Sequence, residues 1–192
     1  MAPQPALTEQ AQAAWAAFLR PGSWAIDATA GNGHDTAALA AAVSPGGRVF
    51  AFDIQGEALR STAALLEKHH LLDAVTLIRG DHRNLREYLP CGVRGRIDLV
   101  CFNLGYLPGG DHAIATRPES TRAGLHESLL LLAPTGALSV IAYRGHSGAL
   151  EEAESVHSFF ETLPAPWECR QSQATGSGHR SGPVWFLASA RP

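Results

Sequence analysis

The chain has 192 residues, a length that suits one domain with a substantial core. Hydrophobic residues make up 45% of it and charged residues 17%, which is typical of a soluble globular protein. The formal net charge of −3 gives no general signal for nucleic-acid binding, so an RNA substrate would have to be attracted by local arginines. The apolar runs are too short and too interrupted to predict a membrane helix.

The N-terminal residues lack the basic and apolar regions of a signal peptide. The 3 cysteines are widely spaced and form no C-x-x-C pair, so they are interpreted as buried free thiols in a reducing compartment. The sequence therefore predicts a cytoplasmic protein.

The predicted elements alternate between helices and strands. Helices are expected over 8–19, 34–43, 56–69, 83–88, 119–132 and 149–162, and strands over 23–28, 48–53, 74–79, 96–102, 137–143, 167–173 and 183–189. This alternation predicts an α/β, doubly wound, mainly parallel sheet with helices on both faces. The last two strands have no helix between them, which favours an antiparallel C-terminal hairpin and the Rossmann-like class I methyltransferase pattern. One domain is expected over 1–192, with 1–20 as its N-terminal helix.

Residues 23–36 are the most informative stretch, because they predict a strand, a tight glycine turn and a helix N-terminus. A dinucleotide-binding fingerprint reads G-x-G-x-x-G, but here Gly31 and Gly33 are followed by Thr36 in place of the third glycine. The carboxylates of Asp27 and Asp35 suit a cationic ligand better than a pyrophosphate. The stretch therefore favours S-adenosylmethionine (SAM), with its sulfonium and ammonium groups, over a nicotinamide cofactor.

Other predicted strands also end in polar residues, where a doubly wound sheet binds its ligands. Asp53 lies twenty residues beyond Gly33, the spacing at which a carboxylate reaches ribose hydroxyls. Asp81 and His82 are expected to flank the adenine, and Asp27 is expected to fix the turn and the methionine ammonium, directly or through water. The alternative for Asp53 and for Asp81 is that each only caps a helix.

Asn103-Leu-Gly-Tyr106 follows the fourth strand and resembles the Asn-Pro-Pro-Tyr motif of amino-group methyltransferases. In those enzymes the asparagine oxygen and a backbone carbonyl hold the substrate NH₂ while the tyrosine stacks on the base. Asn103 and Tyr106 are the candidate catalytic residues, and the alternative is a polar turn with a core tyrosine. The long irregular segment 104–118 is expected to be functional.

The 9 histidines include no H-x-x-x-H helix pair and have no cysteine partner, so no metal site is predicted. His112 or His146 is interpreted as a proton acceptor or phosphate contact. Candidate phosphate contacts among the arginines are Arg83, Arg86, Arg117, Arg122 and Arg144.

Four segments together resemble the bacterial MnmM (YtqB-like) family, long labelled putative rRNA methylases. They are Asp27-Ala-Thr-Ala-Gly-Asn-Gly-His-Asp-Thr36, Ala51-Phe-Asp-Ile-Gln55, Phe102-Asn-Leu-Gly-Tyr-Leu-Pro-Gly-Gly-Asp111 and Tyr143-Arg-Gly-His146. Members of that family are class I SAM-dependent enzymes that methylate the aminomethyl group of wobble 5-aminomethyl-2-thiouridine in tRNA. The segment from Gln173 to Pro183 departs from the family pattern, which leaves the exact nucleoside open.

The resemblance implies SAM as cofactor, the tRNA anticodon stem-loop as partner, and a homodimer. Together with the strand-end argument, it gives the expected cofactor-binding residues: Asp27, Thr29, Ala30, Gly31, Asn32, Gly33, His34, Asp35, Thr36, Asp53, Ile54, Gln55, Asp81, His82, Asn103, Leu104 and Gly105. The expected substrate-binding residues are Tyr106, Leu107, Gly109, Gly110, Asp111, His112, Thr116, Tyr143 and His146.

Three alternatives remain at this point. Within the same chemistry, the substrate could be another RNA base, as in rRNA, or a small amine. Outside it, the chain could be a nucleotide-binding module without catalysis, against which Asn103 and Tyr106 argue. An NAD(P)-dependent oxidoreductase is disfavoured by Thr36 and by the terminal hairpin.

Overall fold

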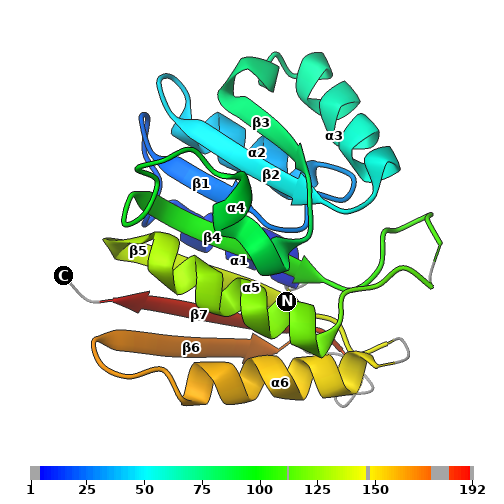
Figure 1. Ribbon diagram of the computed structural model, residues 1–192, viewed down its shortest axis with the longest axis vertical. Helices are drawn as coiled ribbons and strands as arrows, with labels where there is room; N and C mark the ends of the chain where they lie inside the picture. The colour runs from blue at the N-terminus through cyan, green and yellow to red at the C-terminus, as the bar shows by residue number, and fades with distance from the viewer. Residues whose placement is uncertain (1–4, 112, 146–147, 174–181, 191–192) are drawn as a thin grey trace.

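The structure is a computed structural model that describes residues 5–111, 113–145, 148–173 and 182–190. Its seven strands form one sheet in the order β3-β2-β1-β4-β5-β7-β6 (Figure 1). The strands are β1 (Trp24–Asp27), β2 (Arg48–Asp53), β3 (Val75–Arg79), β4 (Ile97–Leu104), β5 (Leu132–Ala142), β6 (Trp167–Gln173) and β7 (Val184–Ala190). The first five are parallel, and β7 runs antiparallel to both β5 and β6. The predicted sheet and its antiparallel C-terminal hairpin are confirmed.

Helices cover both faces of the sheet. They are α1 (Leu7–Trp15), α2 (His34–Val43), α3 (Gly56–Lys68), α4 (Leu85–Tyr88), α5 (Pro118–Leu131) and α6 (Ala149–Glu161), with short 3₁₀ turns at Leu72–Ala74 (η1) and His82–Asn84 (η2). Figure 1 shows α5 and α6 in front of the sheet and α1 and α2 behind it. Among the described helices, none is long and apolar enough to cross a membrane.

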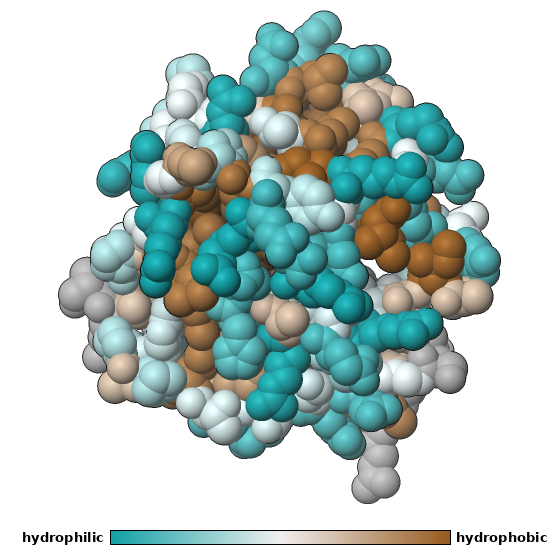
Figure 2. Space-filling model, in the orientation of Figure 1, coloured by the Kyte–Doolittle hydropathy of each residue, from teal (hydrophilic) through white to brown (hydrophobic). Residues whose placement is uncertain are grey.

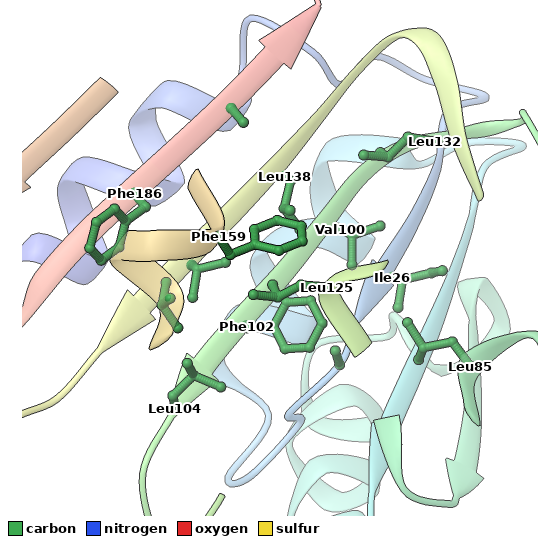
Figure 3. Close-up of a cluster of buried hydrophobic side chains, with 14 of the residues drawn as sticks. Ile26, Leu85, Val100, Phe102, Leu104, Leu125, Leu132, Leu138, Phe159 and Phe186 are labelled. Atoms are coloured by element: carbon green, nitrogen blue, oxygen red, sulfur yellow. The ribbon is translucent and has the colours of Figure 1, made fainter. Parts of the chain in front are cut away.

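Successive residues of the central strands enter two separate cores, because side chains along a strand alternate between faces. On β4, Val100 and Phe102 pack with α5 and α6, whereas Leu99 and Cys101 pack with α1 and α2. Figure 3 shows Val100 and Phe102 in the first core together with Leu125 of α5 and Phe159 of α6. Since β4 is buried on both sides, its position is fixed by packing on each face.

Three predicted boundaries differ from the structure. The first helix ends at Trp15 rather than at 19, because the next residues form tighter bonds, such as Phe18 N–H to the Trp15 carbonyl (2.9 Å). Strand β5 begins at Leu132 rather than 137, since the predicted turn over 134–136 lies within the strand as an irregularity opposite Ile97–Leu99. Strand β4 continues to Leu104, so Asn103 lies inside the strand, paired with Ile141, and not after it.

The cysteines are free, but only Cys101 is buried, while Cys91 and Cys169 are exposed. The expectation of buried thiols was wrong for these two. Cys91 lies in the turn before β4, and Cys169 lies on the edge strand β6, where its thiol donates to the Phe160 carbonyl of α6 (3.3 Å).

The carboxyl ends of β1, β2 and β4 are neighbours, because these strands are adjacent and parallel. The segment after β4, residues 105–117, projects from this edge on the right of Figure 1. A β-bridge between Tyr106 and Ala115 holds its two arms together. The residues singled out by the sequence therefore lie around one edge of the sheet.

Candidate active site at the carboxyl edge of the sheet

A cavity of about 1030 Å³ opens at this edge. Its wall is built from the segments that follow β1, β2, β3, β4 and β5, together with part of α1. Figure 2 shows a hollow on the same side of the molecule as the projecting segment, with hydrophobic surface beside it. Such a crevice beyond the carboxyl ends of parallel strands is where doubly wound sheets bind ligands.

Asp27 lies behind the turn after β1 and not on the cavity wall; it is 1% exposed. Its Oδ1 accepts a bond from the Thr29 N–H (3.1 Å) and its Oδ2 accepts one from the Thr36 hydroxyl (2.6 Å). Thr36 is fully buried, and its hydroxyl bonds Asp27 rather than solvent. Thr36 occupies the position at which a dinucleotide fingerprint has its third glycine. Both residues shape the turn from behind, and their predicted part in cofactor binding stays a prediction.

Burial raises the pKa of Asp27 from 3.8 to about 7, and the nearby Asp35 charge adds to the rise. Because the folded-state pKa is the higher one, the folded protein binds more protons than the unfolded chain between these values. The wild-type free energy of unfolding should therefore fall as the pH rises from about 4 to about 7. We expect Asp27→Asn, which cannot ionise, to be more stable than wild type by on the order of 3 kcal/mol at about pH 8.

Urea unfolding of wild type and Asp27→Asn across this pH range checks the expectation, with exposed Asp73→Asn as the control. The difference between Asp27→Asn and wild type should grow with pH, whereas the control should follow wild type. Parallel profiles for wild type and Asp27→Asn would contradict the assigned ionisation.

Gly33 is required by packing. It lies at the N-terminus of α2 with φ +85°, and a Cβ there would lie 2.8 Å from the Thr62 Cα of α3. Thr62 also donates its hydroxyl to the Gly31 carbonyl (3.0 Å). Gly33 does not line the cavity; its small size allows α3 to pack against the turn, and its predicted cofactor contact stays a prediction.

Asp53 joins the ends of β1 and β2 and lines the cavity. Its Oδ2 accepts the Gly31 N–H (3.0 Å) and its Oδ1 accepts the Gln55 N–H (2.8 Å). Gln55, not Asp53, is the N-cap residue of α3, so the helix-capping alternative is wrong. Burial raises the pKa of Asp53, although these hydrogen bonds oppose the rise. A carboxylate has about four acceptor sites, so two bonds leave it able to accept hydroxyls.

Asp81 and His82 lie on the wall next to β3. Asp81 caps η2 by accepting the Arg83 N–H (2.9 Å) and also pairs with the Arg83 side chain (2.7 Å). The predicted capping is confirmed, while the adenine contact of Asp81 stays a prediction because this residue also lines the cavity. Burial lowers the pKa of His82, which favours the neutral ring. Its buried Nε2 has no hydrogen-bond partner among the described residues, although a buried ring nitrogen normally has one.

Asn103 lines the cavity from β4, and its polar groups are bonded with one exception. Its N–H donates to the Thr29 hydroxyl (2.7 Å), and its Nδ2 donates to Asp35 Oδ2 (2.7 Å). Its Oδ1 is buried and has no partner among the described residues. Tyr106 also lines the cavity and is 37% exposed, so the alternative of a polar turn with a core tyrosine is wrong.

A buried carboxylate holds the segment after β4. Glu152 of α6 is 1% exposed and accepts the hydroxyls of Thr116 (2.7 Å) and Thr121 (2.6 Å). Thr116 in turn accepts the Gly105 N–H (2.9 Å). Thr116 therefore links the wall beside Asn103 to α6 and itself lines the cavity, while its predicted contact with the substrate stays a prediction.

The rim of the cavity is both apolar and basic. Ile54 and Ile114 are 48% and 39% exposed, and Arg83, Arg117 and Arg144 also contribute to the lining. Arg83 pairs with Asp81, whereas neither Arg117 nor Arg144 pairs with a carboxylate in the described part of the chain. Arg86 lies outside the cavity and forms two bonds with Glu127 (2.6 and 2.7 Å).

The structure brings most of the predicted site residues to one wall. Those that line the cavity are Thr29, Ala30, Gly31, Asn32, His34, Asp35, Asp53, Ile54, Gln55, Asp81, His82, Asn103, Leu104, Gly105, Tyr106, Leu107, Gly109, Thr116 and Tyr143.

Two other predicted residues, Gly110 and Asp111, do not line the cavity. Gly110 donates its N–H to the Leu107 carbonyl (2.9 Å), and Asp111 accepts the Ala113 N–H (2.9 Å). Both therefore stabilise the turn at the tip of the projecting segment, and their predicted role as substrate contacts stays a prediction. His112 and His146 lie outside the described residues, as does most of the divergent segment 173–183.

Sequence reasoning missed three contributors to the site. Thr8 and Gln12 of α1 line the cavity, and Glu152 anchors it from α6. The apolar spacing of α1 predicted a helix but gave no sign that its polar side reaches the strand ends.

A parallel sheet with an antiparallel seventh strand, and a cavity at its carboxyl edge bounded by Asp53 and Asn103, define a class I methyltransferase fold. The family model described as "putative rRNA methylase" matches residues 49–187. The chain belongs to this family.

Similar proteins agree with this assignment. A protein of Arabidopsis thaliana named "tRNA (mnm(5)s(2)U34)-methyltransferase, chloroplastic" is 38% identical over 175 residues, which cover 86% of this chain and 63% of that protein. The chain therefore spans somewhat less than two thirds of the length of that relative.

Solved structures match along their whole length. A putative rRNA methylase from Clostridium thermocellum is 35% identical with a TM-score of 0.90. A putative methyltransferase from Streptococcus mutans, solved in complex with SAH, is 28% identical with a TM-score of 0.85. Both alignments cover 100% of this chain and of the matched chain.

Proposed function

We propose that the chain is a SAM-dependent N-methyltransferase that acts on the aminomethyl group of a wobble uridine in tRNA. The observation that carries the proposal is Asn103, whose Oδ1 is buried in the cavity wall without a partner among the described residues. A buried acceptor left unpaired costs about 1–3 kcal/mol, so an N–H donor that binds there recovers this energy. An amine substrate supplies such a donor.

The residues around the cavity fit SAM. Asp53 is placed to accept ribose hydroxyls, and the unpartnered Nε2 of His82 offers a polar contact for an adenine edge. When bound, SAM supplies a methyl group to a nitrogen nucleophile, which gains an N–C bond and loses a proton while the sulfonium becomes a thioether. The matching protein from Streptococcus mutans was solved with SAH, the product of such a transfer, which supports the same cofactor here.

The protein's own contribution is mainly to position the amine. An N–H bound to Asn103 Oδ1 fixes the direction of the nitrogen lone pair, and positioning of this kind recovers roughly 7–11 kcal/mol of a bimolecular barrier. The sulfonium leaving group needs no acid, so no catalytic triad is required. Tyr106, on the same wall, provides an aromatic face for the base.

Transfer RNA is the favoured substrate for two reasons. The Arabidopsis relative is named as a tRNA methyltransferase, and the cavity rim of this chain carries arginines that can contact phosphates. We extend the proposal to the anticodon stem-loop as the bound part of the tRNA. A homodimer and a cytoplasmic location stay predictions from the family resemblance and the sequence.

The test is methyl transfer from labelled SAM to tRNA that carries unmethylated 5-aminomethyluridine, with mass spectrometry of the digested nucleosides. The proposal expects conversion of the aminomethyl nucleoside to its N-methyl form, and tRNA that lacks this group should gain no label. SAM binding without any methylation of RNA or amine would instead support a module without catalysis. Binding of NADH but not SAM would contradict the proposal.

Arg117→Ala and Arg144→Ala are expected to weaken tRNA binding and to reduce the slope of log affinity against log salt by about one each, as for a lost phosphate contact. Arg86→Ala is the matched control, because Arg86 is already engaged by Glu127 outside the cavity. Titrations of labelled tRNA at several salt concentrations measure the slope. If salt barely changes the affinity of the wild type, a small amine becomes the better substrate.

A further inference from the structure

Three polar side chains from different elements form a chain of hydrogen bonds in the cavity wall. Gln12 of α1 donates its Nε2 to Asp35 Oδ1 (2.6 Å), and Asn103 of β4 donates its Nδ2 to Asp35 Oδ2 (2.7 Å). All three residues line the cavity. Asp35, in the first turn of α2, thus lies between an amide on each side.

This arrangement fixes which end of the Asn103 amide is free. An ionised carboxylate only accepts hydrogen bonds, so the group that Asn103 turns toward Asp35 must be its NH₂. The Asn103 backbone N–H is bound separately by the Thr29 hydroxyl, which holds the main chain at the same point. The free end is consequently Oδ1, the atom that has no partner among the described residues.

We propose that Gln12 and Asp35 are positioning residues that act on the reaction through Asn103. They hold its amide with Nδ2 toward Asp35, so that Oδ1 is offered to an N–H of the substrate amine. This inference rests on the proposed function for its substrate. It gives the N-terminal helix α1 a part in the reaction, because Gln12 lies on that helix. Without the two bonds, the amide could turn over and present an NH₂ donor, which repels an amine N–H.

A different role for Asp35 would be to accept a proton from the substrate ammonium. The geometry favours positioning, because each carboxylate oxygen already accepts a side-chain N–H at 2.6–2.7 Å. The two roles predict opposite results for Asp35→Asn, which has the same shape but cannot take up a proton in this way.

The decisive set of variants exchanges the donor and the acceptor between positions 12 and 35. In Asp35→Asn, the new amide oxygen can accept from Asn103. The new NH₂ can donate to the Gln12 oxygen once the Gln12 amide has rotated by half a turn. In Gln12→Glu, two carboxylates face each other and the chain is broken. In the double variant Gln12→Glu/Asp35→Asn, the carboxylate introduced at position 12 accepts from the NH₂ introduced at position 35, which restores the chain.

We expect kcat for methylation of 5-aminomethyluridine in tRNA to fall about tenfold in Gln12→Glu and about a hundredfold in Asp35→Ala. It should stay within about threefold of wild type in Asp35→Asn and in the double variant. The dissociation constant for SAM, measured by calorimetry, should change little in all of them. Gln10→Ala, which removes an amide of α1 that donates to the Pro5 carbonyl (2.8 Å) and does not line the cavity, is the control and should match wild type.

A spectroscopic measurement reports the amide without any turnover. The Asn103 side-chain NH₂ signals, assigned by their loss in Asn103→Ala, should shift and exchange faster with water in Gln12→Glu and Asp35→Ala. In Asp35→Asn and in the double variant they should keep slow exchange. If Asp35→Ala does not fold, the three other variants still decide, because they preserve side-chain volume.

Each failure has its own signature. If the wild-type protein does not methylate the amine, the proposed function is refuted. The NH₂ signals then decide alone whether Gln12 and Asp35 hold the Asn103 amide in place. Wild-type activity with equal activity in Gln12→Glu overturns the inference and leaves the function standing. Loss of activity in Asp35→Asn as severe as in Asp35→Ala also overturns it, in favour of a charge or proton role. A loss of SAM affinity that matches the loss of kcat overturns it in favour of cofactor binding.

Discussion

Replacing Asn103 by alanine is expected to lower kcat for methyl transfer about a thousandfold while the affinity for SAM stays within about threefold. The variant removes Oδ1, a buried acceptor that lacks a partner among the described residues. It leaves the Asn103 backbone N–H, which donates to Thr29 in the turn after β1, and therefore spares the wall on which the cofactor is proposed to lie. An effect on kcat alone is the mark of an interaction that aligns reactants rather than one that binds the donor.

Single-turnover kinetics and SAM calorimetry on the same preparation separate these two effects. The matched control is Asn84→Ala, which removes an asparagine side chain in η2 away from the cavity wall. Full activity in Asn103→Ala would refute the amine-holding role. A parallel loss of SAM affinity would instead make Asn103 a cofactor residue only.

The sequence predicted the parts of the site that depend on local chemistry. Asp27, Gly31 and Gly33 indicate a strand followed by a tight turn, because backbone conformation there depends on adjacent residues. The twenty-residue spacing from Gly33 to Asp53 is that of one strand–helix–strand unit, so the sequence also predicted that Asp53 lies beside the turn. These positions come together because neighbouring parallel strands end at the same edge of the sheet.

What the sequence could not give is the identity of partners far apart along the chain. The bonds from Gln12 to Asp35 and from Thr116 to Glu152 depend on how helices α1 and α6 pack against the sheet. Their apolar faces predict burial, but not which polar residue on the other side meets the site. For the same reason the sequence places Asn103 after its strand, whereas its pairing with Ile141 of β5 extends β4 beyond it.

This distinction also explains why the sequence assigns Thr36 and Asp27 to the ligand. A carboxylate at a strand end is equally able to bind a cofactor or to brace a turn, and only burial tells the two apart. Asp27 is 1% exposed and accepts two bonds from the turn, while Asp53, at the equivalent end of the next strand, lines the cavity. Removal of Asp27 is therefore expected to change the stability of the protein, whereas removal of Asp53 is expected to change its affinity for SAM.

Asp53→Ala is expected to weaken SAM binding by about 2–4 kcal/mol, which corresponds to roughly 30- to 1000-fold in the dissociation constant. Part of the loss comes from hydrogen bonds that the carboxylate is proposed to accept from the ribose hydroxyls. The rest comes from the turn after β1, since Asp53 Oδ2 holds the Gly31 N–H and its Oδ1 holds the Gln55 N–H. Calorimetry with SAM measures the sum of both effects.

Asp53→Asn separates them, because an amide of the same shape can still accept one of these N–H groups but is a weaker acceptor for hydroxyls. The control is Asp98→Ala, which removes a carboxylate that also accepts a backbone N–H, that of Trp24 (2.9 Å), near the amino end of β4. Asp98→Ala should lose stability without losing SAM affinity, since it lies at the opposite edge of the sheet from the cavity. If Asp53→Ala binds SAM as tightly as Asp98→Ala does, Asp53 has no part in holding the cofactor, and its carboxylate serves only to join β1 to β2.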